Sequence, residues 1–115
     1  MGTSEYTRLK KMYFSKEAAD RKEEILQSVI KGKPLSGLYL ITFSTNANEQ
    51  LDIFPSYILL QKSVLNRLPL LVGAAFGRQA AMELVADMAS DAFKTTGTCK
   101  LRDFLLQSNK VELMG

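Results

Sequence analysis

Histidine is absent from this chain of 115 residues, and cysteine occurs once, at Cys99. Histidine is the commonest general acid or base and the commonest metal ligand in proteins, so its absence lowers the expectation of an enzyme. Any catalysis would depend on Asp, Glu, Lys, Tyr or Cys99. Because a single thiol cannot form a disulfide within the chain, the sequence favours a reducing, cytoplasmic setting.

Long apolar segments are absent as well. No run reaches the roughly 18 apolar residues that a membrane-spanning helix needs, and residues 1–6 lack the apolar core of a signal peptide. Association with a membrane is therefore not expected. Proline is scarce, at 3 residues, while 46% of the residues are hydrophobic. This composition predicts one small globular domain over residues 1–115, with residues 1–14 as a flexible or docking arm or a short helix.

Positive charge is in small excess and lies near the N-terminus. The net charge is +3; residues 1–33 hold 8 Lys and Arg against 5 Asp and Glu, and residues 34–115 hold 7 against 7. Nucleic-acid-binding domains concentrate basic side chains on one surface, so this balance gives little support for nucleic acid as a partner. The candidate surface is a basic and aromatic arm that could follow phosphates and stack on bases, or could dock on the sheet or on a second subunit. Its residues are Arg8, Lys10, Lys11, Tyr13, Phe14, Lys16, Arg21 and Lys22.

The strongest pattern is an apolar run over residues 70–76 that passes through Gly77 into an amphipathic helix capped at residues 95–97. The run is apolar on both faces, so we expect a strand inside a sheet, with helices or a partner subunit on each side. In the helix, apolar residues recur at the spacing of one face and acidic residues recur every fourth position on another. The apolar face contains Ala81, Leu84, Val85, Met88, Ala89 and Ala92, and the acidic row contains Glu83, Asp87 and Asp91.

Two further elements precede this strand. Ser15 is a plausible N-cap for a helix over residues 16–31 that ends at Gly32, and the C-terminal half of this helix is expected to pack while its N-terminal half projects. Residues 38–43 are rich in β-branched and aromatic side chains and predict a strand, which a turn over residues 44–50 follows.

A return strand begins near Leu51. Pro55 has no amide donor and demands an edge position or a bulge, and both remain open. The strand is expected to run to Leu60. If Pro55 is a bulge, the strand could instead end at Phe54 and leave residues 57–61 as a short helical turn. Near the C-terminus, residues 101–107 predict a short helix, and residues 108–115 a short strand or a tail, of which the tail is preferred.

The pattern as a whole predicts an α+β fold: an N-terminal helix, about three mostly antiparallel strands, then a long amphipathic helix and a short C-terminal helix packed on the sheet. Because the central strand is apolar on both faces, both faces of the sheet have to be buried, whereas the predicted helices are enough to bury only one of them. We therefore expect a homodimer that buries the other face of the sheet or pairs edge strands across a two-fold axis.

Two segments of the strand and helix described above could bind ions. The turn over residues 73–79 could present backbone amides to an anion, with Arg78 as side-chain partner, although Gly73 and Gly77 also suit close packing and a tight turn. The acidic row could hold a divalent cation with Asp52 or Glu49, although such rows are usually a solvated helix face.

Two polar features remain. Cys99 could be a reactive thiol if a nearby cation or helix N-terminus lowers its pKa, but a small cysteine in a turn is the simpler interpretation. The hairpin tip over residues 46–50, Asn46, Ala47, Asn48, Glu49 and Gln50, could bind a polar ligand, although Asn is common in turns. No residue is assigned to catalysis, a cofactor or a metal. We expect a small non-enzymatic binding or protein-interaction domain, or alternatively a nucleic-acid-associated accessory protein that uses the basic arm.

Overall fold

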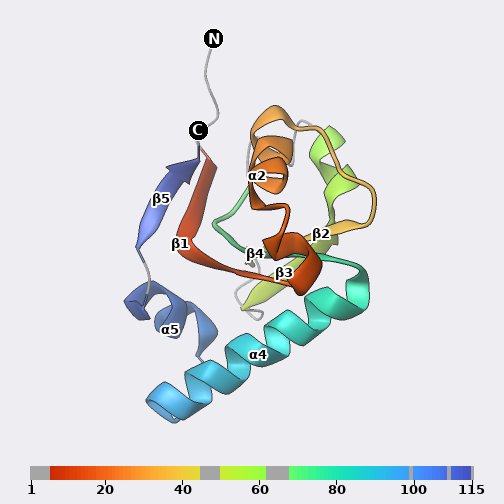
Figure 1. The fold of residues 1–115 in the computed structure, drawn as a ribbon. Coiled ribbons are helices and arrows are strands. Elements are labelled where there is room, and N and C mark those ends of the chain that lie inside the picture. Colours follow the sequence, from red (N-terminus) through yellow and green to blue (C-terminus); the bar gives the residue numbers. More distant parts are fainter. Residues whose placement is uncertain (1–5, 45–49, 62–67, 99, 109, 115) are drawn as a thin grey trace.

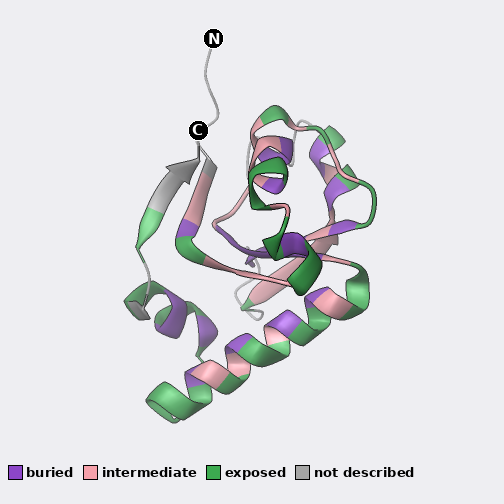
Figure 2. Cartoon of the chain, in the orientation of Figure 1, coloured by how far each residue is buried: buried purple, intermediate pink, exposed green. Residues whose placement is uncertain are grey.

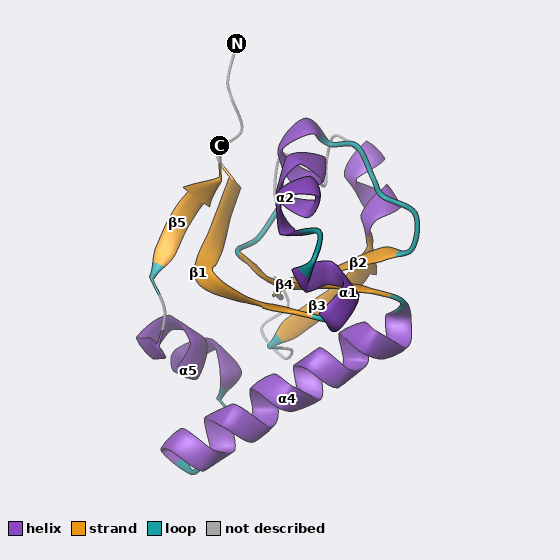
Figure 3. Ribbon diagram, in the orientation of Figure 1, coloured by secondary structure: helices purple, strands orange, loops and turns teal. Residues whose placement is uncertain are grey.

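The computed structural model of the chain describes residues 6–44, 50–61, 68–98, 100–108 and 110–114 (Figure 1). The strands form one mixed sheet, and helices lie on both sides of it (Figure 3). This arrangement confirms the predicted α+β class. The elements in chain order are β1 (Tyr6–Phe14), α1 (Lys16–Ala19), α2 (Lys22–Lys31), β2 (Leu38–Phe43), β3 (Leu51–Pro55), the 3-10 helix η1 (Ser56–Leu60), β4 (Leu71–Phe76), α4 (Arg78–Thr96), α5 (Leu101–Ser108) and β5 (Val111–Met114).

The sheet has five strands in the order β3-β2-β4-β1-β5. The apolar strand β4 lies at its centre, as predicted, antiparallel to β2 and parallel to β1. The outer strands β3 and β5 are antiparallel to their neighbours. The expectation of about three strands was therefore too low, because β1 and β5 both join the sheet.

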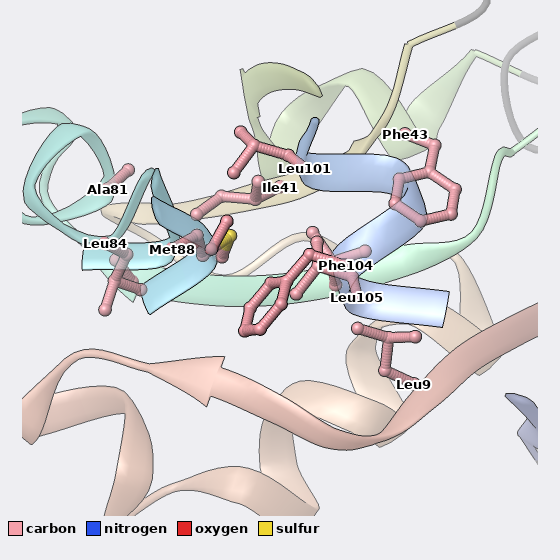
Figure 4. Packing of buried hydrophobic residues seen from close by; sticks show 12 residues of the cluster. Leu9, Ile41, Phe43, Ala81, Leu84, Met88, Leu101, Phe104 and Leu105 are labelled. Atoms are coloured by element: carbon pink, nitrogen blue, oxygen red, sulfur yellow. The ribbon is translucent and has the colours of Figure 1, made fainter. Parts of the chain in front are cut away.

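Two hydrophobic cores lie on opposite faces of the sheet. Alternate residues of β2 contribute to each, with Ile41 in one core and Leu40 in the other. The first core packs α4 and α5 on the sheet, with Phe104 and Leu105 of α5 beside Met88 of α4 (Figure 4). The second packs α1, α2 and η1 on the other face. Its buried residues are Ala18, Ile25, Val29, Leu38, Leu40, Leu59, Leu71 and Ala74.

The expectation that the chain has helices enough for only one face of the sheet was wrong. The chain covers both faces of its own central strand, because α1, α2 and η1 supply the second layer. A second copy is not needed to bury a sheet face. Within the described residues, none of the helices combines the length and apolar character needed to cross a bilayer.

Strand β1 replaces the predicted arm or helix over residues 6–14. Its register with β4 slips: Arg8 pairs with Leu71 and Tyr13 pairs with Gly73, so the two strands advance by different numbers of residues between these pairs. This irregularity interrupts the two-residue alternation that marks a strand in a sequence. At the C-terminus the preferred tail was wrong and the alternative of a short strand is confirmed, since residues 111–114 form β5 against the first half of β1.

The helix predicted over residues 16–31 is divided. The α1 turn ends at Ala19, and α2 begins at Lys22 after Arg21, whose backbone is not helical (φ −127°, ψ 29°). Ala18 in α1 is fully buried, so the N-terminal half does not project as expected. The guanidinium of Arg21 lies over the ring of Phe76, 4.4 Å from its centre, which ties the break to the end of β4.

Gly73 occupies a bulge in β4. Ile41 pairs with Gly73 and the next residue, Thr42, pairs with Leu71, so Val72 is the extra residue. A Cβ atom on Gly73 would lie 2.8 Å from the carbonyl oxygen of Tyr13. Glycine is thus required for the close approach of β1, in agreement with the packing interpretation of the sequence.

Pro55 takes the edge position. It ends β3, which pairs only with β2 in the described sheet. The amide of Ser44 donates to the carbonyl of Gln50 (3.1 Å). Because hydrogen-bonded and non-hydrogen-bonded residue pairs alternate along an antiparallel ladder, the backbone amides and carbonyls of residues 51, 53 and 55 point away from β2. The missing amide of Pro55 therefore costs no hydrogen bond between β3 and β2. The strand ends at Pro55, close to the shorter of the two predicted ends, although no bulge interrupts its pairing with β2, and η1 follows.

Candidate functional site

The carboxyl ends of β1 and β4 meet at one edge of the parallel pair. After β1 the chain enters α1 on one face of the sheet, and after β4 it enters α4 on the other (Figure 1). Such a divergence between adjacent parallel strands is the place where many α/β proteins bind ligands.

Ser15 joins these two strand ends. Its Oγ accepts hydrogen bonds from the amides of Ala18 and Phe76, each at 3.3 Å. Its own amide donates to the carbonyl of Ala74 at 3.2 Å. Ser15 is therefore the N-cap of the first helix, as predicted, and also a clamp between β1 and β4.

A cavity of about 440 Å³ lies beside this clamp. Its charged residues are one lysine and three carboxylates. Hydrophobic and aromatic side chains from the strand ends and from α4 complete the wall. The lining residues are Phe14, Ser15, Lys16, Glu17, Phe76, Ala80, Glu83, Leu84 and Asp87. The cavity therefore carries charges of both signs, with an excess of carboxylates over ammonium groups.

The residues of the predicted basic arm lie in β1, in α1 and at the start of α2, and of these Phe14 and Lys16 line the cavity. The Nζ atom of Lys22 lies 5.3 Å from the ring centre of Phe14. The guanidinium of Arg21 covers the ring of Phe76 in a similar way. Arg21 also donates to both carboxylate oxygens of Glu24, at 2.8 and 2.7 Å. These contacts use the cations and rings within the chain, where the arm hypothesis required them to meet phosphates and bases.

Tyr13 contacts the last residue of the acidic row on α4. The Tyr13 hydroxyl donates to a carboxylate oxygen of Asp91 at 2.7 Å. Burial raises the pKa of Tyr13 well above its usual range, and the hydrogen bond to Asp91 and the charges of Asp91 and Asp87 add to the shift. A phenol that stays protonated is a persistent donor, so this pair fastens β1 to α4.

Among the described residues, the acidic row does not gather into the cation site considered from the sequence. Glu83 and Asp87 are exposed on α4, and Asp91 is bonded to Tyr13. Asp52 lies on β3, and Glu49 lies outside the described residues. In the part of the chain that the structure describes, no group of three His, Cys, Asp or Glu side chains is close enough together to hold a metal ion.

The turn over residues 73–79 also differs from an open anion site. The amide of Gly77 donates to the carbonyl of Gly37 at 2.8 Å, so it is not presented to a ligand. Arg78 is exposed at the start of α4 and is not part of the cavity wall. This turn connects β4 to α4 and to the loop before β2.

The remaining polar candidates are only partly described. Cys99 and residues 46–49 lie outside the described residues. Gln50 is described, and its side-chain oxygen accepts a hydrogen bond from the amide of Leu101 at the start of α5. Gln50 therefore has a structural partner, which connects the β2–β3 hairpin to the C-terminal helix.

A second candidate surface is apolar and lies on the outside of α4. Met82 is 50% exposed and Phe93 is 59% exposed. With exposed Ala86 and half-buried Ala89 they follow one another at spacings of 4, 3 and 4 residues, which places all four on one helix face. Ala89 lies at the inner edge of this face, where it also packs against the first core. We name Met82, Ala86, Ala89 and Phe93 the outer stripe. Exposed and buried residues alternate along α4 (Figure 2).

The predicted assignment of Ala89 to the core face is confirmed, because Ala89 packs against the first core. Met82, Ala86 and Phe93 were not considered together from the sequence. The signal was present, because the same 4-3-4 spacing can be followed in the sequence. A second exposed apolar pair, Tyr57 (66% exposed) and Leu60 (68%), lies on η1, which is separate from α4.

Comparisons of the chain with protein-family models, with curated proteins and with solved structures find no match. The function therefore has to be argued from the two surfaces described above. Of these, the cavity carries mixed charge and the outer stripe is uniformly apolar.

Proposed function

We propose that this protein is a small non-enzymatic binding domain that acts through protein contacts in the cytoplasm and forms a homodimer. The outer stripe of α4 is the observation that supports this proposal. Large apolar side chains that stay half exposed on a long helix, next to a fully packed core, are typical of surfaces that bind another protein. The single cysteine supports the cytoplasmic setting.

The experiment is light scattering over a concentration series from low to high micromolar, with and without a short oligonucleotide of mixed sequence. The monomer mass is 12.8 kDa. We expect the mass to rise toward twice this value as the protein concentration increases, and to be the same with and without the oligonucleotide. A mass that stays at the monomer value at high micromolar concentration would overturn the homodimer.

A nucleic-acid accessory function is the alternative. It predicts that mass increases only when the oligonucleotide is present and that the increase is lost between low and moderate salt, because phosphate contacts release counterions. We rank this function second because the basic residues lie within or next to β1, α1 and α2, and because Arg21 and Lys22 cover aromatic rings of the same chain.

A further inference from the structure

The outer stripe of α4 reads almost the same in both directions. Its members run large, small, small, large, with Met82 and Phe93 at the ends and the two alanines between them. The spacings of 4, 3 and 4 residues are symmetric about the centre. A two-fold axis through that centre would bring each large side chain against the other large one and each alanine against the other alanine.

We propose that two copies of the chain associate through α4, with the two helices antiparallel across a two-fold axis. Met82 of one copy contacts Phe93 of the second copy, and Ala86 contacts Ala89. This inference rests on the homodimer proposed above and names its interface. A C₂ interface uses the same patch on both subunits, so the patch has to be complementary to itself, and the outer stripe meets this requirement.

The spacing also matches the way in which helices pack in pairs. Alternation of 3 and 4 residues is the pattern of a coiled-coil seam, in which side chains of one helix fill the holes of the other. The two alanines at the centre allow the helix axes to approach to about 8 Å. The helix has 19 residues and is about 28 Å long, so the seam spans several turns.

Charge favours the antiparallel direction. Glu83 and Lys94 are exposed and lie on the same flank of the outer stripe, near its opposite ends. They are 11 residues apart, or about 16 Å along the axis, and do not meet within one helix. In an antiparallel pair Glu83 of each copy lies next to Lys94 of the other. In a parallel pair the flank that carries them would lie on opposite sides of the interface in the two copies, and this charge pair could not form. Arg78 would also lie near the negative carboxyl end of the opposite α4.

These properties identify a second copy as the occupant. A different partner would need neither the symmetry of the large and small residues nor a charge pair that is satisfied only by its own copy. The exposed pair on η1, Tyr57 and Leu60, has no such symmetry and supplies the control.

The first test compares Phe93→Glu with Leu60→Glu by sedimentation equilibrium. Both side chains are more than half exposed, so both variants should fold, and far-UV circular dichroism checks this. Phe93→Glu is expected to raise the dissociation constant of the dimer at least about 100-fold, and Leu60→Glu to leave it unchanged. If the wild type dimerises and Phe93→Glu dimerises equally well, the α4 interface is wrong while the homodimer stands. A monomeric wild type overturns both.

The second test uses charge reversal and depends on no buried residue. Glu83→Lys alone and Lys94→Glu alone each place like charges together twice, and each should raise the dissociation constant roughly tenfold. An equimolar mixture of the two variants should restore association, because every 83–94 contact between the two different copies is again a pair of opposite charges. Such rescue can arise only between molecules. Equal weakness of the mixture and of the separate variants would overturn the antiparallel arrangement.

Discussion

Replacing Gly73 with alanine tests the close approach of β1 to β4. A Cβ atom at this position would lie 2.8 Å from the carbonyl oxygen of Tyr13, 3.1 Å from Cε of Met88 and 3.4 Å from Cδ1 of Ile41. The methionine methyl group can turn aside, whereas the Tyr13 carbonyl belongs to the backbone and moves only if β1 shifts away from β4. The contact with the carbonyl therefore determines the cost of the added methyl group.

Two opposing effects set the magnitude. Alanine restricts the unfolded chain and would gain about 0.4–1 kcal/mol over glycine at a site without steric conflict. Overpacking a well-packed core costs about 1–3 kcal/mol. We expect Gly73→Ala to lower the free energy of unfolding by about 1–2 kcal/mol, because the shift has to be taken up by the strand backbone. Urea titration followed by far-UV circular dichroism measures this difference.

The control is the same substitution in a Met88→Leu background, which removes the Cε methyl group. The loss caused by Gly73→Ala should persist there, because the Tyr13 carbonyl is unchanged. Two results would refute the reasoning. The first is a stability equal to or above that of the wild type. The second is a loss that disappears in the Met88→Leu background, which would move the conflict from the β1 backbone to the methionine side chain.

Three further substitutions test polar contacts of the sheet by the same urea titration. Tyr13→Phe removes the donor to Asp91 and should lower the free energy of unfolding by about 1–2 kcal/mol at neutral pH. Because folding raises the pKa of Tyr13, the contribution of its hydroxyl to the free energy of unfolding is complete below the usual pKa of about 10 and declines as the pH rises above that value. If the difference in stability between the wild type and Tyr13→Phe stays constant up to about pH 11.5, this expectation is contradicted. Ser15→Ala removes the cap of α1 and the acceptor for the Phe76 amide and should cost about 1–2 kcal/mol; a neutral effect would show that water replaces both bonds. Thr42→Val should raise stability by about 1 kcal/mol, because its buried hydroxyl has no hydrogen-bond partner among the described residues, and a loss would point to a partner for that hydroxyl.

Elements with strong local signals were predicted correctly. The run of residues 70–76 forms the central strand β4, and the apolar face of the following helix lies in the core. Ser15 caps the first helix, and Gly32 and Gly97 end α2 and α4 in the left-handed conformation (φ 65° and 76°). Each of these features depends on residues within one or two turns of one another, so a single sequence contains the information.

The two missed strands depend on contacts between distant parts of the chain. Strand β1 contains Arg8, Lys10 and Lys11, and its slipped register with β4 removes the alternation of apolar and polar residues. Strand β5 is only 4 residues long and exists as a partner of β1. Neither segment has enough strand propensity by itself, because strand formation depends on the neighbour that supplies the hydrogen bonds.

The candidate sites show the same division. The carboxylates of the acidic row could be found in the sequence, but the hydrogen bond between Tyr13 and Asp91 joins residues separated by 78 positions. The spacing of the outer stripe is visible in the sequence, whereas its exposure depends on which face of α4 the sheet covers. When a helix is apolar on more than one face, periodicity alone does not determine which of these faces packs against the sheet.

The sequence by itself determined the α+β class, the central apolar strand, the long helix and the caps, since these follow from local periodicity and backbone preference. Only the tertiary structure decided that β1 joins the sheet, that the chain covers both faces of β4, and that Met82 and Phe93 stay exposed. The physical reason is that burial and strand pairing are properties of surfaces brought together from distant parts of the chain, and local preferences do not contain them.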